Sequence, residues 1–288
     1  MLNIKDSTKI MVLQETYTLS NNVQLPRLAF GTWQLTEEEA QSAVKDALKA
    51  GYRMVDTAVQ YENETGVGKA VRESGISREE VTVVTKIPHD VKTYDGAKAE
   101  IEGSLKRLGM DYIDLLLIHS PKPWPELFAG SEKTYYEENL AVWRAMEEAY
   151  RDGKVKAIGV SNFEPADMQN IIDHADIMPM VNQIRVHVGH VPTAVLEYCR
   201  EHQIQVMAFS PNATGKLMQH PVVTEMAVRY GVSVPQLCIR FCLQLSTLPL
   251  PKTRHIERMR QNADVDFIIS DSDMQQLLQV EEVSSLPD

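Results

Sequence analysis

Side chains that can move protons stand where short apolar runs of the sequence end. Asp56 and Lys86 each end one such run, and His119 directly follows another, the segment IDLLLI. A carboxylate, an amine and an imidazole can each hold, give or take a proton at a reacting oxygen. Each also has an ordinary structural explanation, because Asp56 and Lys86 can form an ion pair and His119 can be a histidine of the core.

Hydrogen-bonding side chains follow the later apolar runs in the same way. They are Ser161 with Asn162, Gln183, Ser210 beside Phe209, and Lys252. Asn162 could cap a following helix, but a proline suits the first helical position and Pro165 therefore makes Glu164 the expected cap. Several apolar runs are each followed by a polar side chain, and together these side chains indicate a functional site more strongly than any one of them does.

These side chains need a scaffold that brings the ends of separate strands together. Short apolar runs alternate with amphipathic stretches, and no linker rich in Pro, Gly or Ser interrupts them. The expected strands are 28–30, 53–55, 81–85, 113–118, 155–160, 180–182, 205–209 and 248–250. The expected helices include 37–50, 95–108, 137–151, 193–202, 222–230 and 234–245. This alternation predicts a single (β/α)8 TIM barrel, in which reactive groups stand at the carboxyl ends of the strands.

Other segments complete the expected fold. Residues 17–30 predict an N-terminal β-hairpin around Asn21-Asn22, and an extra helix is expected at the C-terminus. Residues 1–16 are expected to be a flexible leader, and residues 1–288 a single domain. A doubly wound open sheet is the alternative, but it needs a Gly-rich turn after its first strand. The nearest match, Gly66-Val67-Gly68, has Val71 in place of the third Gly.

Composition excludes several classes of protein. With 288 residues, 43% hydrophobic, the chain can bury one large core, although two smaller domains would also fit this length. A formal charge of −11 argues against binding to nucleic acid or an anionic membrane. The three cysteines suggest no disulfide framework, and neither a secretory signal nor an apolar run of about 18 residues occurs. We expect a cytoplasmic protein.

Several motifs of the sequence resemble those of the aldo-keto reductases, especially microbial diketogluconate and aldehyde reductases. The segments are GYRMVDTAVQYENETGVGKAV (51–71), TK (85–86), DLLLIH (114–119), IGVSNF (158–163), VNQ (181–183), FSP (209–211) and PKT–R–QN (251–262). They occur in order from about Leu19 to Asn262. The resemblance implies NADPH-dependent reduction of aldehydes or ketones to alcohols.

The resemblance also implies a catalytic group of Asp56, Tyr61, Lys86 and His119. Alone, Tyr61 would be a loop aromatic residue. A developing oxyanion needs a donor, and the phenol of Tyr61 can be that general acid if Lys86 lowers its pKa. Asp56 would pair with the buried ammonium, and His119 would orient the carbonyl oxygen. These roles make chemical sense only as a unit.

The cofactor residues follow from the same resemblance. Ser161, Asn162 and Gln183 would hold the nicotinamide carboxamide, Phe209 would stack on the ring, and Ser210 could bond a phosphate. Lys252, Thr253 and Arg258 would bind the 2′-phosphate of NADPH, since Arg suits bidentate phosphate binding. Gln261 and Asn262 would reach the adenine. A solvated helix face is the alternative for this basic segment.

The substrate pocket is where this sequence departs most from the family. Ser120 stands where many relatives have Trp, which suggests a roomier or more polar pocket, and Trp33 and Trp124 are candidate walls. Arg185 stands in place of an acid. His187 and His190 lack a third ligand, so no metal is expected. Asn63-Glu64-Thr65 matches the glycosylation sequon, but we expect no glycosylation because the sequence shows no secretory signal.

The alternative function is an NADPH-binding regulatory or interaction protein with little turnover. A barrel hydrolase would need paired carboxylates at the strand ends, where Asp56 is the only acid. We expect a monomer that binds a small carbonyl substrate and no nucleic acid or membrane.

Overall fold

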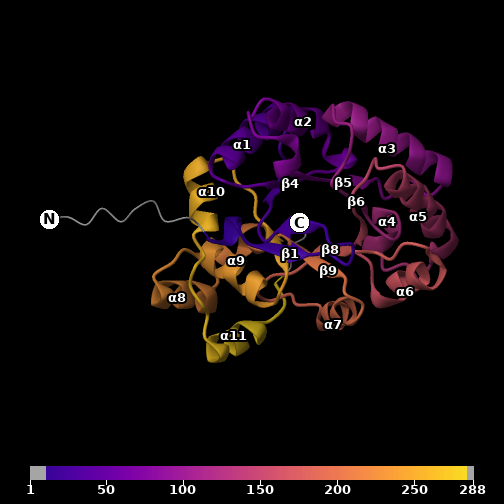
Figure 1. Ribbon diagram of the computed structural model, residues 1–288. Coiled ribbons are helices and arrows are strands. Elements are labelled where there is room, and N and C mark those ends of the chain that lie inside the picture. Colours follow the sequence, from indigo (N-terminus) through magenta and orange to yellow (C-terminus); the bar gives the residue numbers. More distant parts are fainter. Residues whose placement is uncertain (1–10, 284–288) are drawn as a thin grey trace.

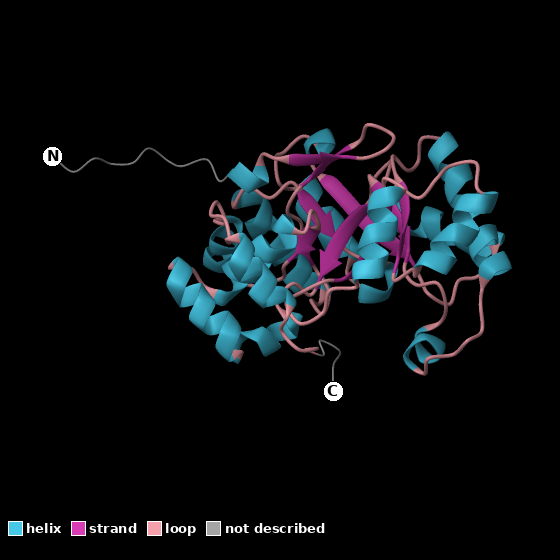
Figure 2. Cartoon of the chain, turned by 90° about the horizontal axis from the view of Figure 1, so that it is seen from below, coloured by secondary structure: helices cyan, strands magenta, loops and turns pink. Residues whose placement is uncertain are grey.

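A parallel barrel forms the centre of the computed structural model, which describes residues 11–283 (Figures 1 and 2). Its strands are β3 (Phe30–Gly31), β4 (Met54–Asp56), β5 (Thr82–Ile87), β6 (Leu115–Ile118), β7 (Ile158–Ser161), β8 (Val181–Arg185), β9 (Gln205–Phe209) and β10 (Leu248–Leu250). Each strand pairs in parallel with the next one along the chain. This confirms the predicted barrel; β3, predicted at residues 28–30, lies one to two residues later.

The barrel closes through a seam between β3 and β10. The Ala29 N–H donates to the Pro249 carbonyl at 3.2 Å, and the Gly31 N–H donates to the Pro251 carbonyl at 3.1 Å. Proline has no N–H, so Pro249 and Pro251 can only accept bonds across this seam. The first and last barrel strands are therefore joined more sparsely than the strands elsewhere.

Helices surround the strands, as Figure 1 shows. They are α1 (Glu37–Lys49), α2 (Glu64–Arg72), α3 (Tyr94–Leu108), α4 (Trp124–Phe128), α5 (Tyr136–Arg151), α6 (Pro165–His174), α7 (Thr193–Glu201), α8 (Pro221–Tyr230), α9 (Val234–Gln244), α10 (Ile256–Ala263) and α11 (Asp271–Leu278). The glycine pair of α2 serves packing, because a Cβ at Gly66 would collide with the Glu37 carbonyl and one at Gly68 with the Leu108 carbonyl. The pair is thus no dinucleotide motif.

The predicted hairpin, β1 (Thr16–Thr18) and β2 (Gln24–Pro26), covers one end of the barrel. The Tyr17 hydroxyl donates to the Thr247 carbonyl, and the Asn21 amide donates to the Lys156 carbonyl. Both acceptors precede barrel strands, so the hairpin lies across the amino ends and leaves the carboxyl ends open.

The predicted leader is wrong in part. Residues 1–10 of it lie outside the described residues, but residues 11–13 form a short 3-10 helix, η1 (Met11–Leu13), in which Val12 is buried. All three cysteines are buried and free. Within residues 11–283, no helix is long and apolar enough to cross a membrane.

Candidate active site

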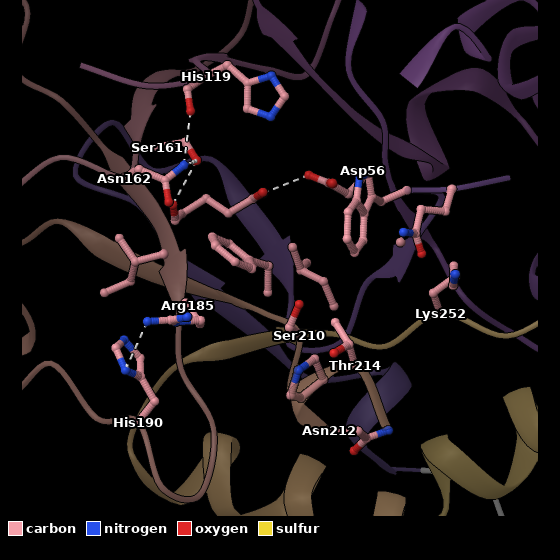
Figure 3. Close-up of a pocket in the computed structure, with 18 of the residues that line it drawn as sticks. Asp56, His119, Ser161, Asn162, Arg185, His190, Ser210, Asn212, Thr214 and Lys252 are labelled. Carbon is pink, nitrogen blue, oxygen red and sulfur yellow. Dashed lines mark hydrogen bonds between the residues drawn. The ribbon is translucent and has the colours of Figure 1, made fainter. Parts of the chain in front are cut away.

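A cavity of about 990 Å³ opens at the carboxyl ends of the strands (Figure 3). The predicted site residues that line it are Trp33, Asp56, Tyr61, His119, Trp124, Ser161, Asn162, Gln183, Phe209, Ser210 and Lys252. They belong to or follow every barrel strand except β5, from the loop after β3 to the loop after β10. The alternation of strand and helix therefore brings together side chains that are far apart in the sequence.

Lys86 joins the candidate catalytic residues beneath this cavity. It is fully buried, and its ammonium donates to Asp56 Oδ1 at 2.7 Å and to the Thr57 carbonyl at 2.8 Å. Tyr61 ends η2 (Val59–Tyr61), a short 3-10 helix in the loop after β4, and its hydroxyl oxygen lies 3.4 Å from Lys86 Nζ. The ion pair considered above as a structural alternative does exist, but it adjoins a phenol that lines the cavity.

The pKa of Tyr61 differs from the prediction. Burial raises the pKa of the phenol, and Lys86 only partly offsets that rise. Burial acts to lower the pKa of Lys86, but Asp56 and Tyr61 outweigh it and the pKa of the lysine is raised. Lys86 therefore stays an ammonium ion, and Tyr61 keeps its proton in the protein without ligand.

His119 faces Tyr61 across the base of the cavity. The two rings meet edge to face, with centroids 5.7 Å apart, and the Trp124 ring lies 5.2 Å from His119 on another side. Burial, with help from Lys86, lowers the pKa of His119 well below its ordinary value. The imidazole is therefore neutral at neutral pH, and its Nδ1 has no hydrogen-bond partner among the described residues.

The three candidate nicotinamide residues are linked in one network. Ser161 donates to the Gln183 carbonyl, while the Asn162 amide donates to the His119 carbonyl and to Ser161. Gln183 donates through Nε2 to Asp56 at 2.7 Å, a bond that sequence reasoning did not anticipate. Within residues 11–283, the amide oxygens of Asn162 and Gln183 accept no bond, so these two acceptors fit the NH₂ group of a carboxamide. The predicted cap is confirmed, since Glu164 precedes Pro165 at the start of α6.

Phe209 ends β9, and Ser210 begins the strained loop that follows it. Ser210, Ala213 and Thr214 have positive φ values of 52°, 48° and 52°. Such values are uncommon for residues other than glycine and persist only where the surroundings impose them. The loop continues into η4 (Ala213–Gln219) and borders the cavity through Ser210, Asn212 and Thr214.

Of the residues expected to bind the 2′-phosphate and the adenine, only one lies in the cavity. Lys252 lines the cavity, whereas Thr253, Arg258, Gln261 and Asn262 do not, and Asn262 is buried. Arg254, the nearby arginine, is bound to Glu39 at 2.9 Å. Lys252 and Arg258 have no ion pair among the described residues. The charge of Lys252 is thus available to a ligand in the cavity, and that of Arg258 to a ligand at α10.

The prediction for Ser120 is wrong. Its side chain is fully buried, has no hydrogen-bond partner in the described part of the chain, and does not line the cavity. The wall is instead formed by Trp124, which stacks on Phe128 in α4 with centroids 5.6 Å apart. Phe128 was missed, although its spacing four residues after Trp124 is a helical signal.

Residues 27–282 match the family described as the Aldo/keto reductase family. The chain belongs to the aldo-keto reductase family.

As an aldo-keto reductase, the chain is an NADP-dependent oxidoreductase that acts on carbonyl groups. It is similar to glyoxal reductase of Bacillus subtilis, with 39% identity over 92% of each chain. It is also similar to 2,5-diketo-D-gluconic acid reductase B of a Corynebacterium, with 38% identity over 87% of each chain. A Bombyx mori aldo-keto reductase solved in complex with NADP has a TM-score of 0.81 and 31% identity, over 92% of each chain.

Other residues that line the cavity of this aldo-keto reductase were not predicted. They include Gln34, Gln60, Leu127, Arg185, His190 and Met218. Arg185 was noted only as a departure, and His190 only as a weak metal candidate. Among the described residues, no group of three or more His, Cys, Asp or Glu side chains could hold a metal ion.

Proposed function

We propose that this enzyme reduces aldehydes and ketones to alcohols, with Tyr61 as the general acid. The observation that carries the proposal is the arrangement of Tyr61, Lys86 and Asp56, with His119 across the cavity base. Bound NADPH would supply the hydride. The phenol then donates its proton to the carbonyl oxygen as negative charge develops there.

Each neighbour of Tyr61 has a defined part in that transfer. Lys86 stabilises the phenolate that remains, and Asp56 keeps the buried ammonium paired. His119, being neutral, can donate a hydrogen bond to the carbonyl oxygen without carrying a charge of its own. The raised pKa of Tyr61 keeps the acid protonated until substrate arrives, and the tyrosine regains its proton from solvent afterwards.

The cofactor residues are proposed on their chemistry. Ser161, Asn162 and Gln183 would hold the carboxamide, Phe209 would pack on the ring, and Ser210 would bond a phosphate. Lys252, Thr253 and Arg258 would bind the 2′-phosphate, which favours NADPH over NADH. Gln261 and Asn262 would serve the adenine, which for Asn262 requires that its buried side chain become accessible.

The substitution Tyr61→Phe tests the mechanism. We expect turnover of a simple aldehyde to fall about 10²- to 10⁴-fold, the usual contribution of a general acid. NADPH binding, followed by fluorescence, should persist, because the ring is retained. Tyr112→Phe is the matched control, since Tyr112 stacks on Lys156 near the amino ends of the strands. Unchanged turnover in Tyr61→Phe contradicts the proposed acid.

The regulatory or interaction alternative predicts tight NADPH binding with little turnover on any carbonyl. A panel of aldehydes, dicarbonyls and keto-sugars, read by NADPH absorbance, separates the two. A cytoplasmic location, a monomeric state, the absence of nucleic-acid binding and a single domain over all 288 residues stay predictions.

A further inference from the structure

Arg185 brings a positive charge into the cavity that the proposed reaction leaves without a role. It ends β8, two residues after Gln183, whose side chain reaches Asp56. Residues two apart on a strand share a face and are separated by about 6–7 Å. Arg185 therefore lies about 6–7 Å further along β8 than Gln183, toward the mouth of the cavity.

The guanidinium of Arg185 is poorly neutralised. Its Nη2 lies 3.2 Å from His190 Nδ1 and 3.8 Å from Glu282 Oε1, and it has no closer carboxylate among residues 11–283. His190 Nδ1 is also 2.8 Å from Glu282, and this atom can either accept from Arg185 or donate to Glu282, not both. Burial lowers the pKa of Arg185, and Glu282 only opposes that effect. Nε and Nη1 of Arg185 have no partner in the described part of the chain.

The position of Arg185 separates it from the proposed phosphate site. Figure 3 shows Arg185 and Lys252 on opposite sides of Ser210. Of the acids that line the cavity, Asp56 is paired with Lys86, and Glu164 forms no ion pair with Arg185. Because the whole chain carries a charge of −11, a local cation is what an anionic substrate would need in order to bind here.

We propose that Arg185, with His190 beside it, binds the carboxylate of a carbonyl substrate, so that oxo acids and aldehyde acids are preferred. The inference rests on the proposed carbonyl reduction and names its substrate class. A planar guanidinium binds a carboxylate through two parallel hydrogen bonds, which the distant Glu282 does not make. Glu282, 3.8 Å from Arg185 Nη2, would compete weakly with the substrate carboxylate for this guanidinium.

A matched pair of aldehydes tests this proposal. 4-Carboxybenzaldehyde carries a charged carboxylate opposite the aldehyde, and methyl 4-formylbenzoate carries the uncharged methyl ester there. We expect the enzyme to prefer the acid, and Arg185→Met to lower the ratio of the two kcat/KM values about 10- to 100-fold. Arg185→Lys should keep part of the preference. Arg200→Met, which removes an exposed charge from α7, should leave the ratio unchanged.

Glu282→Gln gives the opposite test at an exposed position. Removing the competing carboxylate should raise the preference for 4-carboxybenzaldehyde, and this variant decides the question if Arg185→Met does not fold. An unchanged ratio in both variants overturns the proposal. A rise in the KM for NADPH, with the ratio unchanged, assigns Arg185 to a cofactor phosphate and also overturns it. If the unaltered enzyme reduces neither aldehyde, the proposed function itself fails.

Discussion

The two ends of the cavity are built in different ways. At the end near β4 and β5, Lys86 is fully buried and bonded to Asp56, Thr57 and Tyr61. At the end near β9 and β10, Lys252 lies without an ion pair among the described residues, beside a loop with several positive φ angles. At the first end the charged groups are paired within the protein. At the second end an unpaired lysine, beside a strained loop, could bind a charged ligand.

The difference follows from what each end is proposed to do. A catalytic acid must be held in place before the substrate arrives, since preorganised groups need no rearrangement during reaction. A site for a charged, exchanging cofactor must instead leave its cations accessible. The predictions below test this contrast, from the largest expected effect to the smallest.

Lys86→Met should have the largest effect, because it leaves the Asp56 carboxylate buried and unpaired. We expect the free energy of unfolding to fall by about 3–5 kcal/mol and turnover to be almost lost. Adding Asp56→Asn should restore much of the stability, measured by urea unfolding, but not the turnover. Recovery of turnover in the double variant would mean that the ion pair serves stability only.

Asn63→Ala should separate positioning from stability at the same end. Asn63 is fully buried; its amide donates to the Thr32 and Leu35 carbonyls and its oxygen accepts from Thr57 at 2.6 Å. These bonds close the loop that carries Tyr61. We expect the free energy of unfolding to fall by about 1–3 kcal/mol and kcat to fall about 10- to 100-fold. A stability loss with kcat unchanged would show that Tyr61 does not depend on this closure.

Arg258→Met tests the open end. The KM for NADPH should rise about tenfold or more while that for NADH changes little, because only NADPH carries the 2′-phosphate. Folding should be unaffected, since Arg258 is exposed and has no ion pair among the described residues. Equal changes for both cofactors would make the basic segment a solvated helix face.

The pH profile should show the smallest effect at the buried end. A depressed pKa keeps His119 neutral until the pH falls well below about 6.5, and a raised pKa keeps Tyr61 protonated until the pH exceeds about 10. We therefore expect kcat/KM for a neutral aldehyde to lack a step between these values. A step near pH 6.5 would mean that His119 is far less buried in solution.

The barrel and the polar residues at its strand ends can be predicted from local periodicity, whereas Tyr61 and the cofactor residues were expected only from the resemblance to the aldo-keto reductases. A polar residue at the carboxyl end of a strand, such as Asp56 or Ser161, lies at the open face of the barrel. The same reasoning fails at Ser120, since the direction of a loop side chain depends on long-range packing. It also misses the Gln183 bond to Asp56, which joins residues 127 positions apart.

The pKa of Tyr61 shows a second limit of sequence reasoning. Its partner Lys86 can be recognised from motifs, but the extent of burial cannot, and burial decides the direction of the shift. Asn63 is similar: in the sequence it resembles a misplaced glycosylation site, and only the fold reveals it as the residue that closes the loop around Tyr61.

The seam between β3 and β10 has a consequence for how the chain is made. The Gly31 N–H donates to the Pro251 carbonyl, so a chain emerging from the ribosome cannot close its barrel until Pro251 has been synthesised. Until then β3 is an exposed edge, which is a hazard for aggregation. The hairpin bond from Tyr17 to Thr247 has the same dependence, so barrel closure and hairpin docking belong among the last steps of folding.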